Sequence, residues 1–351
     1  MNSLLRLTIP TLILCGAFYA NLQAGEASAD WRRIEALDNG PGIQPKTADE
    51  AKAVVIAHMD QQERELRSFL SQHPQDPHAF EAKLRLARLL SIRAGADNSE
   101  KRRAEASALL DQLAKTATAP EQVVEVDFSK VTTLMRNLRE VGPTQREELL
   151  SAVRGFQAAH PRDRRVAALL TETATLFDAQ PKVKTDLLLD AQNLATDEEL
   201  KGRISDDLKR VNFLATEVPL RFNTMSGKAV DAAEFRGKVL VVAFFASWSP
   251  PSMITVRNIQ EEASRLPKGK TQILGISLDQ NPASLAAALK QTGVTWPVGF
   301  DGKGWAGPLV RSLGINAVPT VWVLDKKGRL RVLNASQDII GPVNQLLMEN
   351  E

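Results

Sequence analysis

The amino-acid sequence predicts an α-helical domain of repeated helical hairpins followed by a smaller α/β domain. Helix-forming Ala, Leu, Arg and Glu are frequent before residue 215, whereas Val, Ile, Trp, Phe and Gly become frequent after it. Apolar stripes at helical spacing recur in the first part, and a continuous β-branched run over residues 239–245 marks the second. A chain of 351 residues is long enough to form two such domains.

The first 24 residues have the pattern of a secretory signal peptide. A positive charge, Arg6, precedes an apolar stretch over residues 7–20, and small residues follow it. This stretch is short for a membrane span, so we expect cleavage after Ala24 and export to the periplasm or another extracytoplasmic compartment. The alternative is an uncleaved N-terminus that anchors the protein in a membrane.

Cysteine usage limits the chemistry of the mature chain. Cys15 is the single cysteine in the sequence, and removal of residues 1–24 leaves none. Disulfides, thiolate metal sites and cysteine nucleophiles are then excluded from the exported protein. A lipoprotein signal at Cys15 is disfavoured, because the large Leu14 stands directly before it.

Charge and motif content argue against several partner classes. The formal net charge is +2, neither sign forms a long block, and aromatic residues make up 5% of the chain. We therefore expect no nucleic-acid partner and no strong membrane binding after signal cleavage. The sequence contains no dinucleotide fingerprint, P-loop or cluster of metal ligands, so neither a cofactor nor a metal is expected.

A linker and a helical domain follow the signal peptide. Residues 25–46 are rich in Gly, Pro, Asp and Asn and lack periodicity, which predicts a linker with a short helix near Trp31. Residues 47–215 have a helical pattern throughout. Helices are expected over or near residues 76–95, 99–117, 166–177 and 181–195.

An internal repeat divides this helical domain. The string F-L-S-Q-H-P-Q-D over residues 69–76 returns as F-Q-A-A-H-P-R-D over residues 156–163. Each copy should end a helix at His-Pro and begin the next with the aspartate as a cap. The layout resembles tetratricopeptide-type helical hairpins. His73 and His160 are interpreted as helix-ending residues beside a helix dipole, with metal ligation as the alternative.

The pattern of the C-terminal domain, residues 216–351, alternates strands and helices. Its elements follow the order βαβα and then ββα. Strands are expected at residues 239–245, 271–278, 320–324 and 329–333, and helices at 253–266, 282–292 and 339–348.

Two motifs identify a family resemblance. Residues 234–252 read E-F-R-G-K-V-L-V-V-A-F-F-A-S-W-S-P-P-S, which is similar to the "FRGKvvlvnFWAtWCPPC" signature of TlpA-like and redoxin (AhpC-TSA-related) proteins. Residues 314–320, G-I-N-A-V-P-T, resemble the family's "vPT" segment, whose proline has a cis peptide bond facing the active site. The resemblance implies a thioredoxin-like fold for the C-terminal domain, with Pro319 as the cis proline.

The resemblance also shows what is missing. Ser249 and Ser252 occupy the two positions of the family's redox cysteines. Dithiol exchange needs a thiolate nucleophile and a second thiol that resolves the mixed disulfide. Ala243 stands where the family places a buried acid or amide that manages protons. We therefore expect no catalytic residue and no thiol–disulfide exchange by this domain's own side chains.

A hydrolytic role for Ser249 competes with a structural one. A nucleophilic serine needs an adjacent base, yet no histidine follows His160 and no G-x-S-x-G elbow occurs. The structural interpretation, which we favour, is that Ser249 caps the helix that follows the turn.

The residues around the altered motif remain candidates for binding. In the family, the surface formed here by Trp248, Pro250, Pro251, Val318 and Pro319 holds an extended peptide. It could still bind a protein or peptide, or it could be a relic buried against the helical domain. The favoured hypothesis is an exported, non-enzymatic binding or scaffolding protein. The alternatives are a redoxin-type oxidoreductase that obtains its redox group from elsewhere, and a membrane-tethered form of the binding protein.

Overall fold

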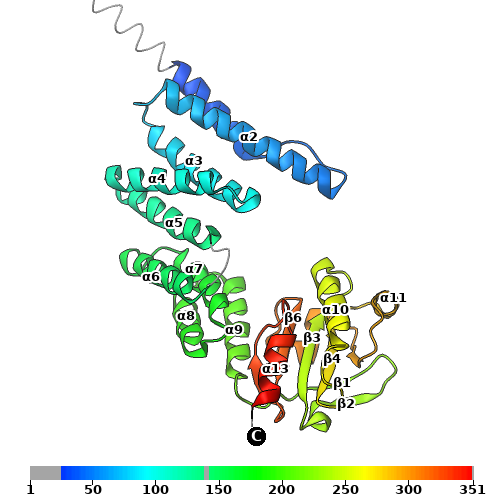
Figure 1. The fold of residues 1–351 in the computed structure, drawn as a ribbon. Coiled ribbons are helices and arrows are strands. Elements are labelled where there is room, and N and C mark those ends of the chain that lie inside the picture. Colours follow the sequence, from blue (N-terminus) through cyan, green and yellow to red (C-terminus); the bar gives the residue numbers. More distant parts are fainter. Residues whose placement is uncertain (1–24, 138–141, 350–351) are drawn as a thin grey trace, which may run out of the picture. The chain divides into compact units, whose positions relative to one another are not determined.

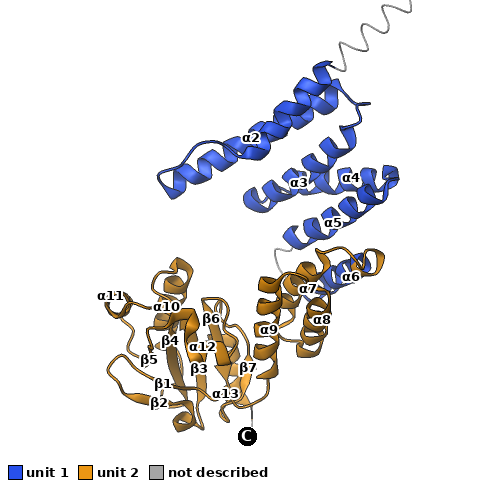
Figure 2. Ribbon diagram, turned by 180° about the vertical axis from the view of Figure 1, so that it is seen from behind, with its two compact units in different colours: residues 1–156 blue, residues 157–351 orange. Residues whose placement is uncertain are grey.

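The computed structural model describes residues 25–137 and 142–349. The predicted signal peptide, its predicted cleavage after Ala24 and Cys15 lie outside the described residues. The chain forms two compact units, Met1–Phe156 and Gln157–Glu351 (Figures 1 and 2). Within the described residues, no helix combines the length and the apolar character needed to cross a membrane.

The first unit is helical, as the sequence predicts. Residues 25–36 already form a helix, and Trp31 from this segment is buried in a core with Phe69 and Leu90. The segment expected to be a linker therefore begins as a packed helix. The later elements are η1 (Leu37–Asn39), α2 (Ala48–Gln72), α3 (Ala79–Asp97), α4 (Glu100–Thr116), α5 (Pro120–Asn137) and α6 (Pro143–Ala159), whose last residues belong to the second unit.

The two copies of the sequence repeat fold into the same turn. The Oδ1 atom of Asp76 accepts a hydrogen bond from the backbone nitrogen of His78 at 2.8 Å. In the second copy, Oδ1 of Asp163 accepts one from the backbone nitrogen of Arg165, also at 2.8 Å. Helices α3 and α7 (Val166–Ala174) begin directly after these turns. The N-cap residues of α3 and α7 are His78 and Arg165, and neither helix has a side-chain cap hydrogen bond, so the predicted capping role of the two aspartates is wrong. Each aspartate instead closes the turn that precedes its helix, because its side chain accepts from the backbone nitrogen two residues on.

His73 has a structural place at the end of α2. It is the C-cap residue, and its backbone nitrogen donates to the carbonyl oxygen of Phe69 at 2.8 Å. Its Nε2 atom lies 2.9 Å from Oδ2 of Asp30 on the first helical segment. The described residues contain no group of three or more His, Cys, Asp or Glu side chains that could hold a metal ion.

The second unit joins three helices to the α/β domain. The helices are α7, α8 (Pro181–Leu194) and α9 (Glu198–Asn212), with η2 (Thr175–Phe177) between the first two. The sequence divides the domains near residue 215, whereas the compact units divide at Phe156. Polar contacts between α9 and the α/β domain, such as the hydrogen bond from Arg210 to Gly314, explain why these helices group with it.

A five-stranded mixed sheet is the centre of the α/β domain. Its order is β5-β4-β3-β6-β7, with β3, β4 and β5 parallel and β6 and β7 antiparallel to their neighbours. This is a thioredoxin-like arrangement, so the predicted fold class is confirmed. The strands are β3 (Val239–Phe245), β4 (Thr271–Ser277), β5 (Val298–Gly299), β6 (Thr320–Leu324) and β7 (Leu330–Val332).

The helices and short elements of this domain surround the sheet. The remaining elements are β1 (Arg221–Asn223), β2 (Ala229–Asp231), η3 (Ala232–Phe235), α10 (Pro250–Ala263), α11 (Pro282–Thr292), η4 (Gly304–Ala306), α12 (Pro308–Ser312) and α13 (Ile340–Met348). Helix α10 begins three residues before its predicted start, because Pro250 and Pro251 occupy its first turn, where their lack of an N–H is harmless. Strands β1, β2 and β5 are too short for the sequence pattern to predict.

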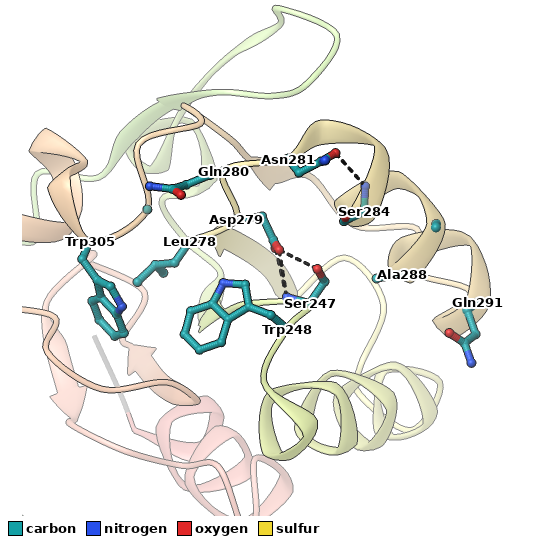
Figure 3. A pocket seen from close by; sticks show the side chains of 12 residues that line it. Ser247, Trp248, Leu278, Asp279, Gln280, Asn281, Ser284, Ala288, Gln291 and Trp305 are labelled. Atoms are coloured by element: carbon teal, nitrogen blue, oxygen red, sulfur yellow. Dashed lines mark hydrogen bonds between the residues drawn. The ribbon is translucent and has the colours of Figure 1, made fainter.

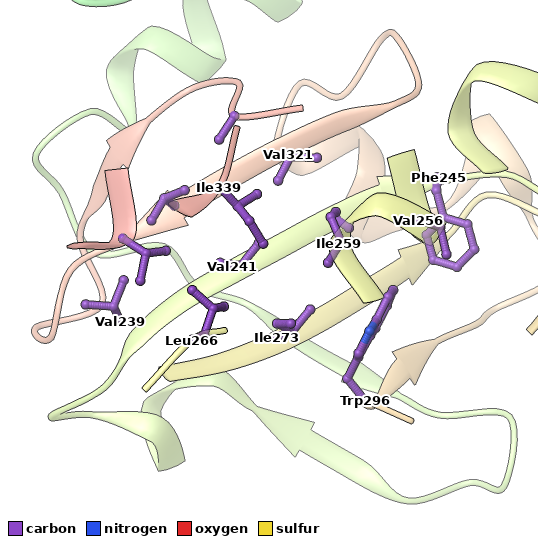
Figure 4. Packing of buried hydrophobic residues seen from close by; sticks show 14 of the residues in the cluster. Val239, Val241, Phe245, Val256, Ile259, Leu266, Ile273, Trp296, Val321 and Ile339 are labelled. Atoms are coloured by element: carbon purple, nitrogen blue, oxygen red, sulfur yellow. The ribbon is translucent and has the colours of Figure 1, made fainter. Parts of the chain in front are cut away.

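Strand β3 is buried along its whole length and organises two apolar layers. Its odd-numbered residues, such as Val241 and Phe245, pack with Val256 and Ile259 of α10 (Figure 4). On the opposite face, Phe244 meets Trp322 edge-on, with ring centroids 5.2 Å apart. Burial on both faces is what the continuous apolar run predicts.

Candidate functional site

The altered motif forms the turn between β3 and α10. Ser249 is the N-cap of α10, with extended backbone angles (φ −100°, ψ 108°). Its Oγ atom accepts a hydrogen bond from the backbone nitrogen of Ser252 at 3.3 Å, and its carbonyl oxygen accepts one from Met253 at 3.1 Å. The predicted capping role of Ser249 is confirmed. The cap uses the hydroxyl as an acceptor for a backbone group that α10 would otherwise leave unsatisfied.

Ser252 occupies the second sulfur position and is fully buried, with 0% of its surface exposed. Its Oγ atom has no hydrogen-bond partner within the described part of the chain. A buried hydroxyl without a partner is costly, whereas a thiol, which behaves as a small apolar group, suits such a place. The local environment therefore still fits sulfur better than oxygen.

The predicted cis proline lies at the same edge of the sheet. The Val318–Pro319 peptide bond is cis. Thr320, the next residue, begins β6 and pairs with Phe244 near the end of β3. Because the two strands are antiparallel neighbours, the end of β3 and the start of β6 bring the motif turn and Pro319 together.

We call Trp248, Pro250, Pro251, Val318 and Pro319 the motif surface. Trp248 is 57% exposed, and both Pro250 and Pro251 are exposed. Val318 and Pro319 are half-buried. The structure therefore gathers the five residues that the sequence singles out and leaves the tryptophan open to solvent. Their role in binding stays a prediction.

A buried carboxylate that the sequence analysis missed holds the motif turn. Asp279, 2% exposed, follows β4 and accepts hydrogen bonds from the backbone nitrogen of Ser247 at 3.0 and 3.2 Å and from its hydroxyl at 2.5 Å (Figure 3). The hydroxyl of Ser277 donates to the same carboxylate at 2.7 Å. The sequence feature that could have identified it is an acidic residue directly after a strand expected to be buried and parallel. Asp279 thereby fixes the backbone that presents Trp248.

A second exposed tryptophan, also missed from the sequence, lies beside the first. Trp305 in η4 is 42% exposed, and its ring centroid lies 6.5 Å from that of Trp248 at an interplanar angle of 59°. Both rings border a cavity of about 690 Å³ whose polar lining includes Asn281 and Gln291 (Figure 3). Trp305 stands among glycines in G-K-G-W-A-G, outside any periodic stretch. That position was the clue that it is not a core residue.

Helix α9 anchors the segment that leads to Pro319. The guanidinium of Arg210 donates to the carbonyl oxygen of Gly314 at 2.7 Å and also contacts Oδ1 of Asn316. The amide of Asn316 donates to Asp207 at 2.9 Å, and Asp207 pairs with Arg210. These contacts link the end of the helical region to one side of the motif surface.

Ala243 lies in the middle of β3, is 1% exposed and packs in the apolar cluster beneath α10. An alanine side chain cannot take up or release a proton. The structure thus places an inert group at the position where the family resemblance leads us to expect a proton carrier.

Comparison with protein-family models matches residues 211–347 to the model described as Redoxin. Among curated proteins, the chain is similar to the thiol-disulfide oxidoreductase ResA of Bacillus thuringiensis and to that of Bacillus cereus. Each is 24% identical over 119 residues, which is 34% of this chain and 63% of the relative. The match therefore spans less than two thirds of the relatives' own length.

Solved structures with similarity to the chain include two bacterial proteins. One is a thiol-disulfide oxidoreductase from Bacteroides fragilis, with 22% identity and a TM-score of 0.33, covering 36% of this chain and 96% of that one. The other is a thiol:disulfide interchange protein of the thioredoxin family from Chlorobium tepidum, with 26% identity and a TM-score of 0.31, covering 38% and 97%.

Proposed function

We propose that the chain is an exported, non-enzymatic binding protein, because residues 211–347 match the Redoxin model while serines stand at the two positions where the family's signature has cysteines. Its motif surface would hold an extended segment of a protein or peptide partner. The single observation that supports this proposal best is the 57% exposure of Trp248 beside the cis Pro319 turn. Exposed aromatic side chains are enriched at binding sites because they contribute large apolar area to an interface.

Electron exchange is excluded from the proposal on chemical grounds. A serine hydroxyl does not ionise usefully near neutral pH and cannot form a disulfide, so Ser249 and Ser252 supply neither nucleophile nor resolving group. The Ser249 oxygen already accepts the Ser252 backbone N–H. A relative's name as an oxidoreductase therefore does not transfer to this chain's own residues.

The helical part would supply a second docking surface in the proposed protein. Its hairpins resemble tetratricopeptide-type units, and the repeated His-Pro turns give both copies the same local geometry. Export depends on the N-terminal sequence pattern, and cleavage after Ala24 would release the protein into an extracytoplasmic compartment.

A single-cysteine trap tests binding at the motif surface. In a Cys15→Ala background, Ser249→Cys places one thiol at the N-terminus of α10, where the helix dipole favours the thiolate. The probe is an unstructured peptide whose cysteine carries a thionitrobenzoate group. The introduced thiolate attacks the peptide sulfur, a new S–S bond forms, and thionitrobenzoate leaves with the electron pair of the old bond.

The control compares two thiols on one helix. For each variant, the measured quantity is its rate of reaction with the peptide divided by its rate with a small aromatic disulfide. For Ile254→Cys, at a position that is 58% exposed, this ratio should equal that of a free thiol. We expect this rate ratio to be higher for Ser249→Cys than for the control. It should return to the control value when Val318→Asp places a charge on the motif surface. Equal ratios in all three proteins would refute peptide binding here.

The oxidoreductase alternative has its own assay. Insulin reduction by the mature unmodified chain, with no other thiol protein present, should not exceed the rate of the reductant alone. Turnover above that rate would overturn the non-enzymatic assignment.

A further inference from the structure

The cavity beside the motif surface combines two exposed tryptophans with an apolar floor. Trp248 and Trp305 border it, and Leu278 and Ala288, both buried, line its base. Figure 3 shows the two indole rings on the same side of the cavity, opposite the side chains of α11. Neighbouring solvent-exposed tryptophans are unusual on a surface that binds nothing, because they leave large apolar areas in water.

The polar lining carries no available charge. Asp279 is the ionisable residue that lines the cavity, and its carboxylate already accepts hydrogen bonds from Ser247 and Ser277. The rest of the rim consists of hydroxyl and amide side chains, which include Ser284, Gln280, Asn281 and Gln291. A lining of this kind favours a neutral ligand.

The side-chain amide of Asn281 offers a ligand hydrogen-bond donors rather than an acceptor. Oδ1 of Asn281 accepts hydrogen bonds from the backbone nitrogens of Ala283 at 2.9 Å and Ser284 at 3.2 Å, which leaves its NH₂ group to face a ligand. The two indole N–H groups can only donate. A matching ligand is neutral, rich in acceptors and able to pack apolar rings against indole.

We propose that this cavity binds a proline-rich peptide segment in the polyproline II conformation. The pyrrolidine rings would pack on Trp248 and Trp305. A polyproline II chain has no internal hydrogen bonds, so its carbonyl oxygens would accept from the indole and amide donors of the rim. This inference rests on the proposed function, because Trp248 belongs both to the motif surface and to the cavity. The bound peptide would run from Pro319 past Trp248 into the cavity.

Continuity with the motif surface favours a peptide over a neutral saccharide, which could also stack on tryptophan. The saccharide is therefore an outcome of the test. The cavity volume of about 690 Å³ accommodates a few peptide residues rather than a single ring.

Calorimetric titration of the full chain tests the inference. The probe is a synthetic neutral peptide of four Ala-Pro-Pro repeats, and the matched peptide replaces every proline by alanine. We expect the proline peptide to bind at least about tenfold more tightly than its match, and Trp305→Ala to weaken binding by about tenfold or more, as truncation of a central aromatic does. Met225→Ala, at a position 40% exposed on the β1–β2 hairpin, should leave the affinity unchanged.

A second variant keeps the test independent of any folding defect in Trp305→Ala. Ala287→Glu adds a charged side chain at an exposed lining position of α11 and should abolish binding of the proline peptide. Equal affinity for both peptides, binding that survives both variants, or binding of a maltooligosaccharide alone would overturn the inference. If the Ser249→Cys trap still captures proline-free peptides in that case, the proposed function stands without it.

Discussion

The Oγ atom of Ser249 accepts a hydrogen bond from the backbone nitrogen of Ser252 at 3.3 Å. The two residues at the former sulfur positions therefore serve a helix cap. The cap holds the start of α10, and with it the orientation of the exposed Trp248 that directly precedes Ser249.

Loss of this cap should destabilise the C-terminal domain. Ser249→Ala removes the acceptor for the Ser252 N–H, and cap deletions of this type cost about 1 kcal/mol. Ser249→Asp retains an acceptor and should keep most of the stability. Urea unfolding followed by tryptophan fluorescence measures both. The matched control is Ser264→Ala, at the exposed C-terminal end of the same helix. Equal effects at Ser249 and Ser264 would contradict the capping role.

The buried hydroxyl of Ser252 predicts a stabilising substitution. Because its Oγ atom lacks a partner within the described chain, Ser252→Ala removes an unsatisfied polar group and should raise the free energy of unfolding by about 1 kcal/mol. Ser277→Ala is the opposite case, because its hydroxyl donates to Asp279 at 2.7 Å, and it should destabilise. Thermal unfolding of both variants shows whether each substitution raises or lowers the stability. A loss of stability in Ser252→Ala would mean that the hydroxyl has a partner.

Restoring both cysteines should restore the disulfide without full activity. In Ser249→Cys/Ser252→Cys, the first turn of a helix in a thioredoxin-like fold places the two thiols within bonding reach, since a bridge needs Cα atoms less than about 7 Å apart. Thiol titration after oxidation should show both thiols consumed. Insulin reduction should remain slow and should rise when Ala243→Asp adds a proton carrier. A pair that cannot close would contradict the fold at this turn.

Gly314 should be among the least replaceable glycines of the chain. Its φ of +68° is left-handed, and an added Cβ would lie 2.4 Å from the backbone oxygen of Asp206 in α9. Gly293 has the same backbone conformation (φ +67°) but nothing within 4 Å of an added Cβ. Gly293→Ala should therefore cost about 1–2 kcal/mol for backbone strain alone. Gly314→Ala should cost clearly more and should speed amide exchange in the Gly314–Asn316 segment. Equal costs would show that α9 does not approach this turn closely.

The contact between the first helical segment and the end of α2 should weaken at acidic pH. The hydrogen bond from His73 holds the pKa of Asp30 below its ordinary value of 3.8, with a contribution from the charge of Arg33. A lowered pKa in the folded state means that the contribution to stability is complete above the ordinary value and is lost as pH falls through the lowered one. Amide exchange over residues 25–36 should accelerate in that range. Asp30→Asn should remove this pH dependence of the exchange rates. If the exchange rates of the variant depend on pH as those of the unmodified chain do, the role of Asp30 is refuted.

Local features were predictable from the sequence. The Ser249 cap, the helix ends before His73 and His160 and the buried run of β3 all depend on residues within a few positions of each other. Short-range backbone geometry fixes which of these groups can meet, so a one-dimensional pattern is sufficient. Very short elements such as β5 were not predicted, because two residues give no periodic pattern.

The sequence by itself determined that serines stand at positions 249 and 252, where the redoxin signature that this region resembles has cysteines, because the loss of sulfur is a matter of residue identity. Only the tertiary structure decided that Asp279 holds the Ser247 backbone, that Arg210 of α9 reaches Gly314, and that Trp305 lies beside Trp248. These residues are far apart in the chain, and the folded sheet and helices bring them together. Contacts of that kind follow from the packing of whole elements, which no local pattern specifies.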